Sequence, residues 1–102
     1  MSAKDGSGYV GPAELRDAIV VGLFRDDAVV RVILQTALGP GLTLTFRDVT
    51  AVVEKRPTGM KLAGLSKAPV GARERFVFVN ASDGDDARLE LTAAGFEVSS
   101  SP

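Results

Sequence analysis

The sequence contains no histidine, no cysteine and no tryptophan among its 102 residues. Without histidine, the chain lacks the commonest general acid and base, the usual base of a hydrolase triad and the main nitrogen ligand for zinc. Without cysteine, it has neither disulfides nor thiolate chemistry, which suits the reducing cytoplasm. We therefore expect a cytoplasmic protein that is not an enzyme and that needs no cofactor.

An excess of one charge and long apolar runs are also missing. The 12 basic and 13 acidic residues give a formal net charge of −1, so overall electrostatics favour neither nucleic acid nor a membrane surface as a partner. No apolar run approaches the roughly 20 residues of a membrane span. The first residues, MSAKDGSGYVGP, lack the apolar core of a signal peptide. We expect no membrane association.

The stretch from residue 28 to 49 predicts a β-hairpin. Apolar and polar residues alternate with a period of two, most clearly from Leu42 to Arg47, as in a half-buried strand. Gly39-Pro40-Gly41 supplies the turn. The apolar positions that we expect to face a core are Val30, Val32, Leu34, Leu42, Leu44 and Phe46. A hairpin with one apolar face is unstable alone in water, so the rest of the chain must cover it.

Other short apolar segments predict further strands. The run Ile19-Val20-Val21 favours a strand that is buried on both faces, and Phe76 and Phe78 share one face of a later strand. Further strands are expected over residues 49–54, 89–92 and 96–98, with a turn at 80–86. About seven short strands separated by turns indicate an all-β antiparallel sandwich, with a small β-barrel as the alternative. Residues 1–12 are expected to form a loosely packed tail, 13–99 a single domain and 100–102 a polar end.

The segment from Arg56 to Ala72 shows no sustained period. Met60, Leu62 and Leu65 are scattered among glycine and proline residues, so we predict an irregular connection. Long irregular connections are uncommon in small domains and are usually functional or disordered. The three apolar side chains form either a lid over the sandwich or a contact surface, and we expect a contact surface.

Basic residues concentrate in the same region. Between Glu54 and Arg75 there are six basic and two acidic residues, a net charge of +4. We expect this region to bind another protein or a second copy of the chain; the alternative is a small ligand or anion. Nucleic acid is disfavoured because the segment has no stacking aromatic residue before Phe76. The candidate interaction surface comprises Lys55, Arg56, Met60, Lys61, Leu62, Leu65, Lys67, Arg73 and Arg75.

Three nearby carboxylates, Asp83, Asp85 and Asp86, are the most suggestive candidate for a metal site. Clustered carboxylates on a loop with glycine can bind Ca²⁺. The spacing does not match a calcium-binding helix-loop-helix, since no bidentate glutamate follows at the required distance. Asp and Gly also supply the backbone conformations of a hairpin turn. We interpret the group as a solvated turn and predict no metal.

The order of segments resembles that of small bacterial β-sandwich domains of unassigned function, some of which are immunity-type proteins of polymorphic toxin systems. The matching segments are VVRVILQ, the GPG turn, LTLTFRDVTAVV, an irregular middle and RLELTAAGFEV, within residues 17–99. The resemblance is one of pattern and carries no binding motif with it. It implies a non-enzymatic interaction module, either immunity- or inhibitor-like or self-associating.

Overall fold

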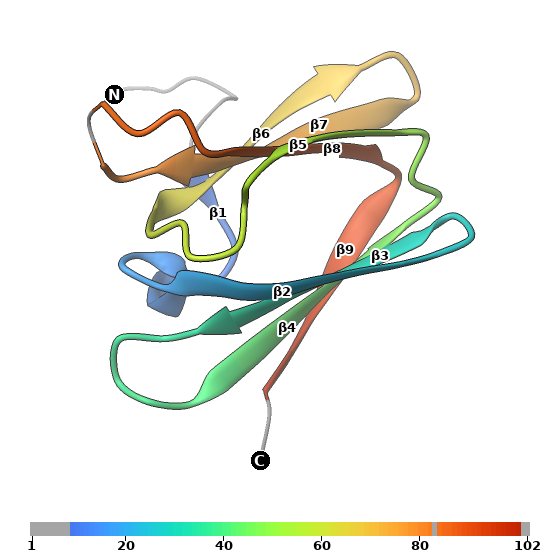
Figure 1. Cartoon of the computed structure of the whole chain (residues 1–102). Helices are drawn as coiled ribbons and strands as arrows, with labels where there is room; N and C mark the ends of the chain where they lie inside the picture. Colours follow the sequence, from blue (N-terminus) through green and yellow to red (C-terminus); the bar gives the residue numbers. More distant parts are fainter. Residues whose placement is uncertain (1–8, 83, 101–102) are drawn as a thin grey trace, which may run out of the picture.

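The structure, a computed structural model, describes residues 9–82 and 84–100 as two antiparallel β-sheets packed face to face (Figure 1). One sheet has five strands in the order β1-β6-β7-β8-β5, and the other has four in the order β2-β3-β4-β9. These two layers confirm the predicted all-β sandwich. The strands are β1 (Tyr9–Val10), β2 (Ile19–Asp26), β3 (Val29–Gln35), β4 (Gly41–Arg47), β5 (Ala51–Lys55), β6 (Leu62–Val70), β7 (Arg73–Asn80), β8 (Arg88–Ala93) and β9 (Gly95–Ser100).

Strands β3 and β4 form the predicted hairpin. Val30 pairs with Phe46 and Leu34 with Leu42, so the alternating apolar side chains of both strands fall on the same, inner face. All six predicted positions are buried. The loop closes through a hydrogen bond from the Thr36 N–H to the Pro40 carbonyl, 3.2 Å long, and Gly39 has a φ of +118° that favours glycine. The hairpin therefore follows directly from its sequence pattern.

Strand β2 exists as predicted, but the expectation that both of its faces are buried is wrong. Val20 is completely buried, whereas Ile19 and Val21 are 39% and 49% exposed. β2 is the first strand of the four-stranded sheet, and only the inner face of that sheet is covered by the other layer (Figure 1). A run of β-branched residues here reflects strand propensity rather than two-sided burial.

The prediction of an irregular connection from Arg56 to Ala72 is also wrong. Its second half is β6, a nine-residue strand that pairs with β7 along its whole length. The pairing register shifts between Leu62 and Gly64. Such a β-bulge inserts one extra residue, so Leu62 and Leu65, an odd number of positions apart, both point into the core. The bulge removes the period of two that would have revealed the strand.

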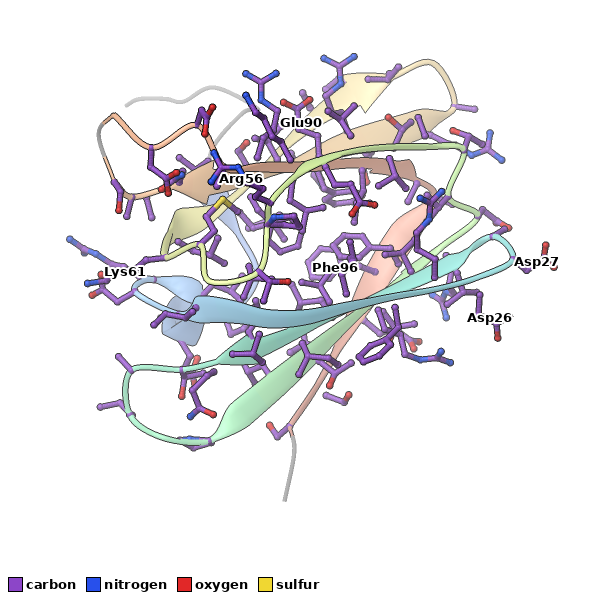
Figure 2. The ribbon with its side chains drawn as sticks, viewed as in Figure 1. Asp26, Asp27, Arg56, Lys61, Glu90 and Phe96 are labelled. Carbon is purple, nitrogen blue, oxygen red and sulfur yellow. The ribbon has the colours of Figure 1, made fainter. Side chains whose placement is uncertain are left out.

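Aromatic rings from both layers meet at the centre of the core. The ring of Phe46 in β4 lies 5.2 Å from that of Phe76 in β7, edge to face, and 5.3 Å from that of Phe96 in β9, stacked. Phe78 lies 5.8 Å from Phe46. Figure 2 shows Phe96 between the two layers. These contacts, at the separations that aromatic pairs prefer, join strands of both sheets.

The two sheets are also joined by main-chain hydrogen bonds at one corner. There the chain before β2 runs beside the chain before β6. The N–H of Val20 donates to the Met60 carbonyl over 2.9 Å, and the N–H of Leu62 donates to the Ala18 carbonyl over 2.8 Å. The N–H of Gly59 donates to the Val20 carbonyl over 2.6 Å. This corner covers the start of the β2 edge and leaves the remainder uncovered.

The ends of the chain are only partly described. Of the predicted tail, residues 1–8 lie outside the described residues, while Tyr9 and Val10 pair with β6 and a 3₁₀ turn, η1 (Ala13–Leu15), follows. Of the predicted polar end, Ser100 belongs to β9, and residues 101–102 lie outside the described part. Within that part, no helix has the length and apolar character needed to cross a membrane.

Candidate interaction surfaces

The three apolar residues of the candidate surface that we predicted from the sequence are buried. Met60 is 2% exposed, and Leu62 and Leu65 are completely buried. They belong to the core, so they do not form the contact surface that we expected. Each of these side chains stabilises the fold, because burying an apolar side chain of this size is typically worth about 1.5–3 kcal/mol.

The six basic residues of that surface do not form one patch. Lys67 lies beside Glu74 (Nζ–Oε2 3.1 Å), and Lys61 is 3.9 Å from an Asp17 carboxylate oxygen. The Arg73 side chain donates to the Asp48 carbonyl over 3.0 Å. Arg75 is exposed on β7. Acceptors of the chain itself therefore lie beside three of these four basic side chains.

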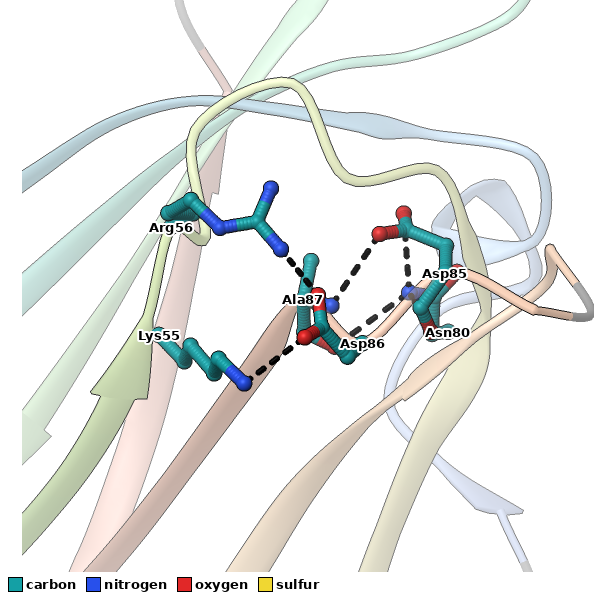
Figure 3. Close-up of polar contacts among 6 residues, drawn as sticks. All are labelled: Lys55, Arg56, Asn80, Asp85, Asp86 and Ala87. Carbon is teal, nitrogen blue, oxygen red and sulfur yellow. Dashed lines mark hydrogen bonds and ion pairs between the residues drawn. The ribbon is translucent and has the colours of Figure 1, made fainter.

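The remaining two basic residues meet the acidic loop between β7 and β8 (Figure 3). Lys55 Nζ lies 2.7 Å from an Asp86 oxygen, and the Arg56 guanidinium bonds the other oxygen of the same carboxylate. The hydrogen bond from Lys55, with the charge of Arg56 beside it, lowers the pKa of Asp86 below its usual value. All three residues are exposed to solvent. It links the end of β5 to the β7–β8 loop.

Asp85 shapes the same loop. It accepts hydrogen bonds from the Asn80 side chain over 3.2 Å and from the Ala87 N–H over 3.1 Å, and the bond from Asn80 lowers its pKa. Asn80 Oδ1 in turn accepts from the Ser82 N–H over 2.8 Å. The loop is held by these side-chain contacts, and Gly84 alone of its described residues has a positive φ, +83°, whereas we predicted that both Asp and Gly would supply such conformations. Among the described residues no group of three acidic side chains is placed to hold a metal ion; Asp83 lies outside them.

A different surface, which we did not predict from the sequence, lies on the outer side of the four-stranded sheet. We name it the β2 face; it comprises Ile19, Val21, Phe24 and Ile33. Phe24 is 60% exposed. A Cβ atom added at Gly22 would lie 3.3 Å from the Phe24 ring and 3.6 Å from Ile33. The Phe24 ring therefore lies beside Gly22 and Ile33, and Ile19 and Val21 are exposed on the same strand as Phe24.

The β2 face borders an unpaired strand edge. Within the described residues, the main-chain groups of β2 bond the segment before β6 only as far as Val20. Beyond the β-bulge between Val20 and Gly22, the edge from Gly22 to Asp26 pairs with β3 alone. An unpaired edge next to exposed apolar side chains is a common docking site for another β-strand.

The edges of the five-stranded sheet are less suited to strand pairing. Beyond its pairing with β1, strand β6 carries Lys67 and Pro69, and both residue types discourage edge pairing. β5 has only five residues. Its exposed Val53 is surrounded by charged residues of the same outer face, since Glu90 lies opposite it and Lys55 pairs with Arg88. Leu38, at 87% exposure, stands alone at a loop tip.

One pocket is an open depression of about 680 Å³ between the N-terminal segment and the start of β6. Its lining includes Arg16, Asp17 and Asn80, of which Arg16 and Asp17 are exposed to solvent. Every buried side-chain N or O atom among the described residues has a hydrogen-bond partner. Ligand pockets usually combine deep burial with a few fixed polar groups, and this depression lacks that combination.

Comparisons with known proteins identify no relative. No family model matches the chain, and no curated protein or solved structure matches it.

Proposed function

We propose that this chain is a non-enzymatic protein-interaction module that binds through the β2 face. The observation that carries the proposal is that β2 exposes Ile19, Val21 and Phe24 beside an unpaired strand edge, with the half-buried Ile33 on the neighbouring strand. Large apolar side chains that cluster on a surface mark contact sites more often than isolated ones do. The main-chain groups of the edge add hydrogen bonds that require only an extended partner.

The resemblance to bacterial immunity-type sandwich domains supports an inhibitor-like or scaffolding role rather than catalysis. The absence of histidine and cysteine from the sequence supports the same choice, and the absence of cysteine suits a role in the cytoplasm. An anion-binding role is less well supported. Lys55, Arg56 and Lys67 already contact carboxylates of the chain itself.

The proposal is tested with a matched pair of variants. Phe24→Asp places a charge on the β2 face, and Val53→Asp places one on the outer side of the other sheet, where Val53 is 49% exposed. Proteins captured from a bacterial extract are purified, and their affinity for each variant is measured. We expect Phe24→Asp to weaken binding by more than about tenfold, as for the loss of a central aromatic contact, and Val53→Asp to leave it unchanged. Partners that bind Phe24→Asp as tightly as the wild type would refute the proposal.

A further inference from the structure

We propose that a second copy of this chain occupies the β2 edge, so that β2 pairs with β2 of the other copy about a twofold axis at Phe24. This inference rests on the proposed function, because it names the partner of the same surface. It would join two four-stranded sheets into one continuous sheet. The directions of the main-chain groups along β2 support this pairing.

The alternation of hydrogen-bonded and non-hydrogen-bonded pairs fixes these directions. The Thr36 N–H bonds the Pro40 carbonyl of the β3–β4 loop, so Leu34 and every second residue before it direct their main-chain groups to β4. Ile33, Arg31 and Val29 then direct theirs to β2, where their partners are Gly22, Phe24 and Asp26. It follows that the N–H and C=O groups of the residues between those partners, Leu23 and Arg25, point away from β3.

Those groups have no main-chain partner among the described residues. They repeat at the spacing of hydrogen-bonded pairs in an antiparallel ladder. The same set of groups on a second copy, rotated by a twofold axis, offers the complementary donors and acceptors. An isologous interface of this kind is the usual basis of a homodimer.

Only one register uses all of these groups. With the axis at Leu23, Arg25 would face Val21, where the β-bulge interrupts the strand. With the axis at Arg25, Leu23 would face Asp27, a turn residue with a φ of +58°. With the axis at Phe24, Leu23 faces Arg25 of the copy and Arg25 faces Leu23. This last register produces two hydrogen-bonded residue pairs and involves neither the bulge nor the turn.

The side chains are compatible with this register. The two Phe24 rings lie opposite each other on the outer face, in a non-hydrogen-bonded pair, where cross-strand side chains are closest. Asp26 lies opposite Gly22 of the copy, and Arg25 lies opposite Leu23. Because no like charges face each other directly, the register avoids the repulsion that destabilises such pairs. Arg25 also keeps its contact with Glu54, at 3.5 Å.

The interface is short, so the dimer is expected to be weak. The bulge and the inner-side charge of Arg25 are features that restrict edge pairing, and they limit it here to Gly22–Asp26. A stretch of this length buries less than the roughly 1,600 Å² of a standard interface. Dimer and monomer should therefore interchange with protein concentration by mass action.

The test is sedimentation velocity over about a hundredfold range of concentration on the wild type, Arg25→Ala, Arg25→Pro and Val53→Asp. Arg25→Ala and Arg25→Pro both lose the contact with Glu54, but only proline removes the outward N–H, and an edge position tolerates proline without loss of a β2–β3 bond. Melting curves confirm that each variant is folded. We expect a concentration-dependent dimer in the wild type, in Val53→Asp and in Arg25→Ala, and a dissociation constant at least about tenfold higher in Arg25→Pro than in Arg25→Ala.

A wild type that remains monomeric throughout, or Arg25→Pro and Arg25→Ala with equal dissociation constants, would overturn the inference. These outcomes are separable from the test of the proposed function. If the wild type is monomeric but a different protein binds in a Phe24-dependent manner, the interaction function stands and the self-pairing fails. If the dimer forms through β2 and no other protein binds, the inference stands and the interaction is one of self-association.

Discussion

The ring of Phe24 lies over Gly22, so close that a Cβ atom at residue 22 would be 3.3 Å from the ring. The glycine leaves space for the Phe24 ring on the outer face of an edge strand. The ring is nevertheless 60% exposed. The ring is therefore an apolar group on the surface that packs only partly against the rest of the chain.

Replacement of Phe24 should therefore cost little stability. We expect Phe24→Ala to lower the free energy of unfolding by about 1 kcal/mol, in proportion to the part of the side chain that is buried. The matched variant Phe46→Ala removes a completely buried ring and should cost about 3–5 kcal/mol. Urea denaturation measures both values. Similar losses for the two variants would mean that Phe24 is a core residue and is unavailable to a partner.

The burial of Met60 and Leu65 leads to a second prediction. Since Met60 and Leu65 are buried at 2% and 0% exposure, we expect Met60→Ala and Leu65→Ala each to lower the free energy of unfolding by about 2–5 kcal/mol. Lys61→Ala, at an exposed position between them, should change it by less than about 0.5 kcal/mol. If either core variant unfolded at the same denaturant concentration as the wild type, the inward orientation assigned to these side chains would be incorrect.

Some of the strands can be predicted from the sequence pattern and others cannot, and the reasons are physical. The β3–β4 hairpin is predictable because Leu42, Leu44 and Phe46 alternate with polar residues. The strand β6 is not, because its bulge places Leu62 and Leu65 on one face at an odd spacing. Alternation is a reliable indicator only where pairing is regular.

The candidate surface was missed for a related reason. Ile19, Val20 and Val21 form a continuous apolar run, and such a run gives no indication of which face is covered. That information depends on β2 being an edge strand, which is a property of the topology. The basic residues from Lys55 to Arg75 gave a local charge pattern, but their partners, Asp17 and Asp86 among them, lie far away in sequence.

Gly11 provides a test of the packing of the N-terminal segment. It has a φ of +88°, and an added Cβ would lie 2.8 Å from Leu15 Cδ1. Gly59 has a similar φ of +95° with nothing within 4 Å of the added atom. Gly11→Ala and Gly59→Ala should each be destabilised by about 1 kcal/mol or more through backbone strain. Gly11→Ala should lose more, because of the clash with buried Leu15. Equal melting temperatures for the two variants would contradict this contact.

The contact between Lys55 and Asp86 predicts a dependence on pH. The hydrogen bond from Lys55 lowers the pKa of Asp86 in the folded state, so its stabilising effect is present above the unfolded pKa of about 3.9 and is lost as the pH falls through the folded value. We expect Asp86→Asn to melt below the wild type at about pH 7 and together with it at about pH 2. The difference at neutral pH should shrink in high salt, because the pair is exposed. A difference that is the same at both pH values would exclude this role for the carboxylate.

Residue-specific amide hydrogen exchange tests the central claim, that the edge of β2 is uncovered within the chain and available to a partner. In dilute protein, the Leu23 and Arg25 N–H groups should exchange much faster than those of Phe24 and Asp26, which bond to β3. At high concentration, Leu23 and Arg25 should become protected while amides elsewhere keep their rates. If Leu23 and Arg25 are as strongly protected as Phe24 in the dilute protein, the edge is already covered within the chain, and β2 is not the interaction surface.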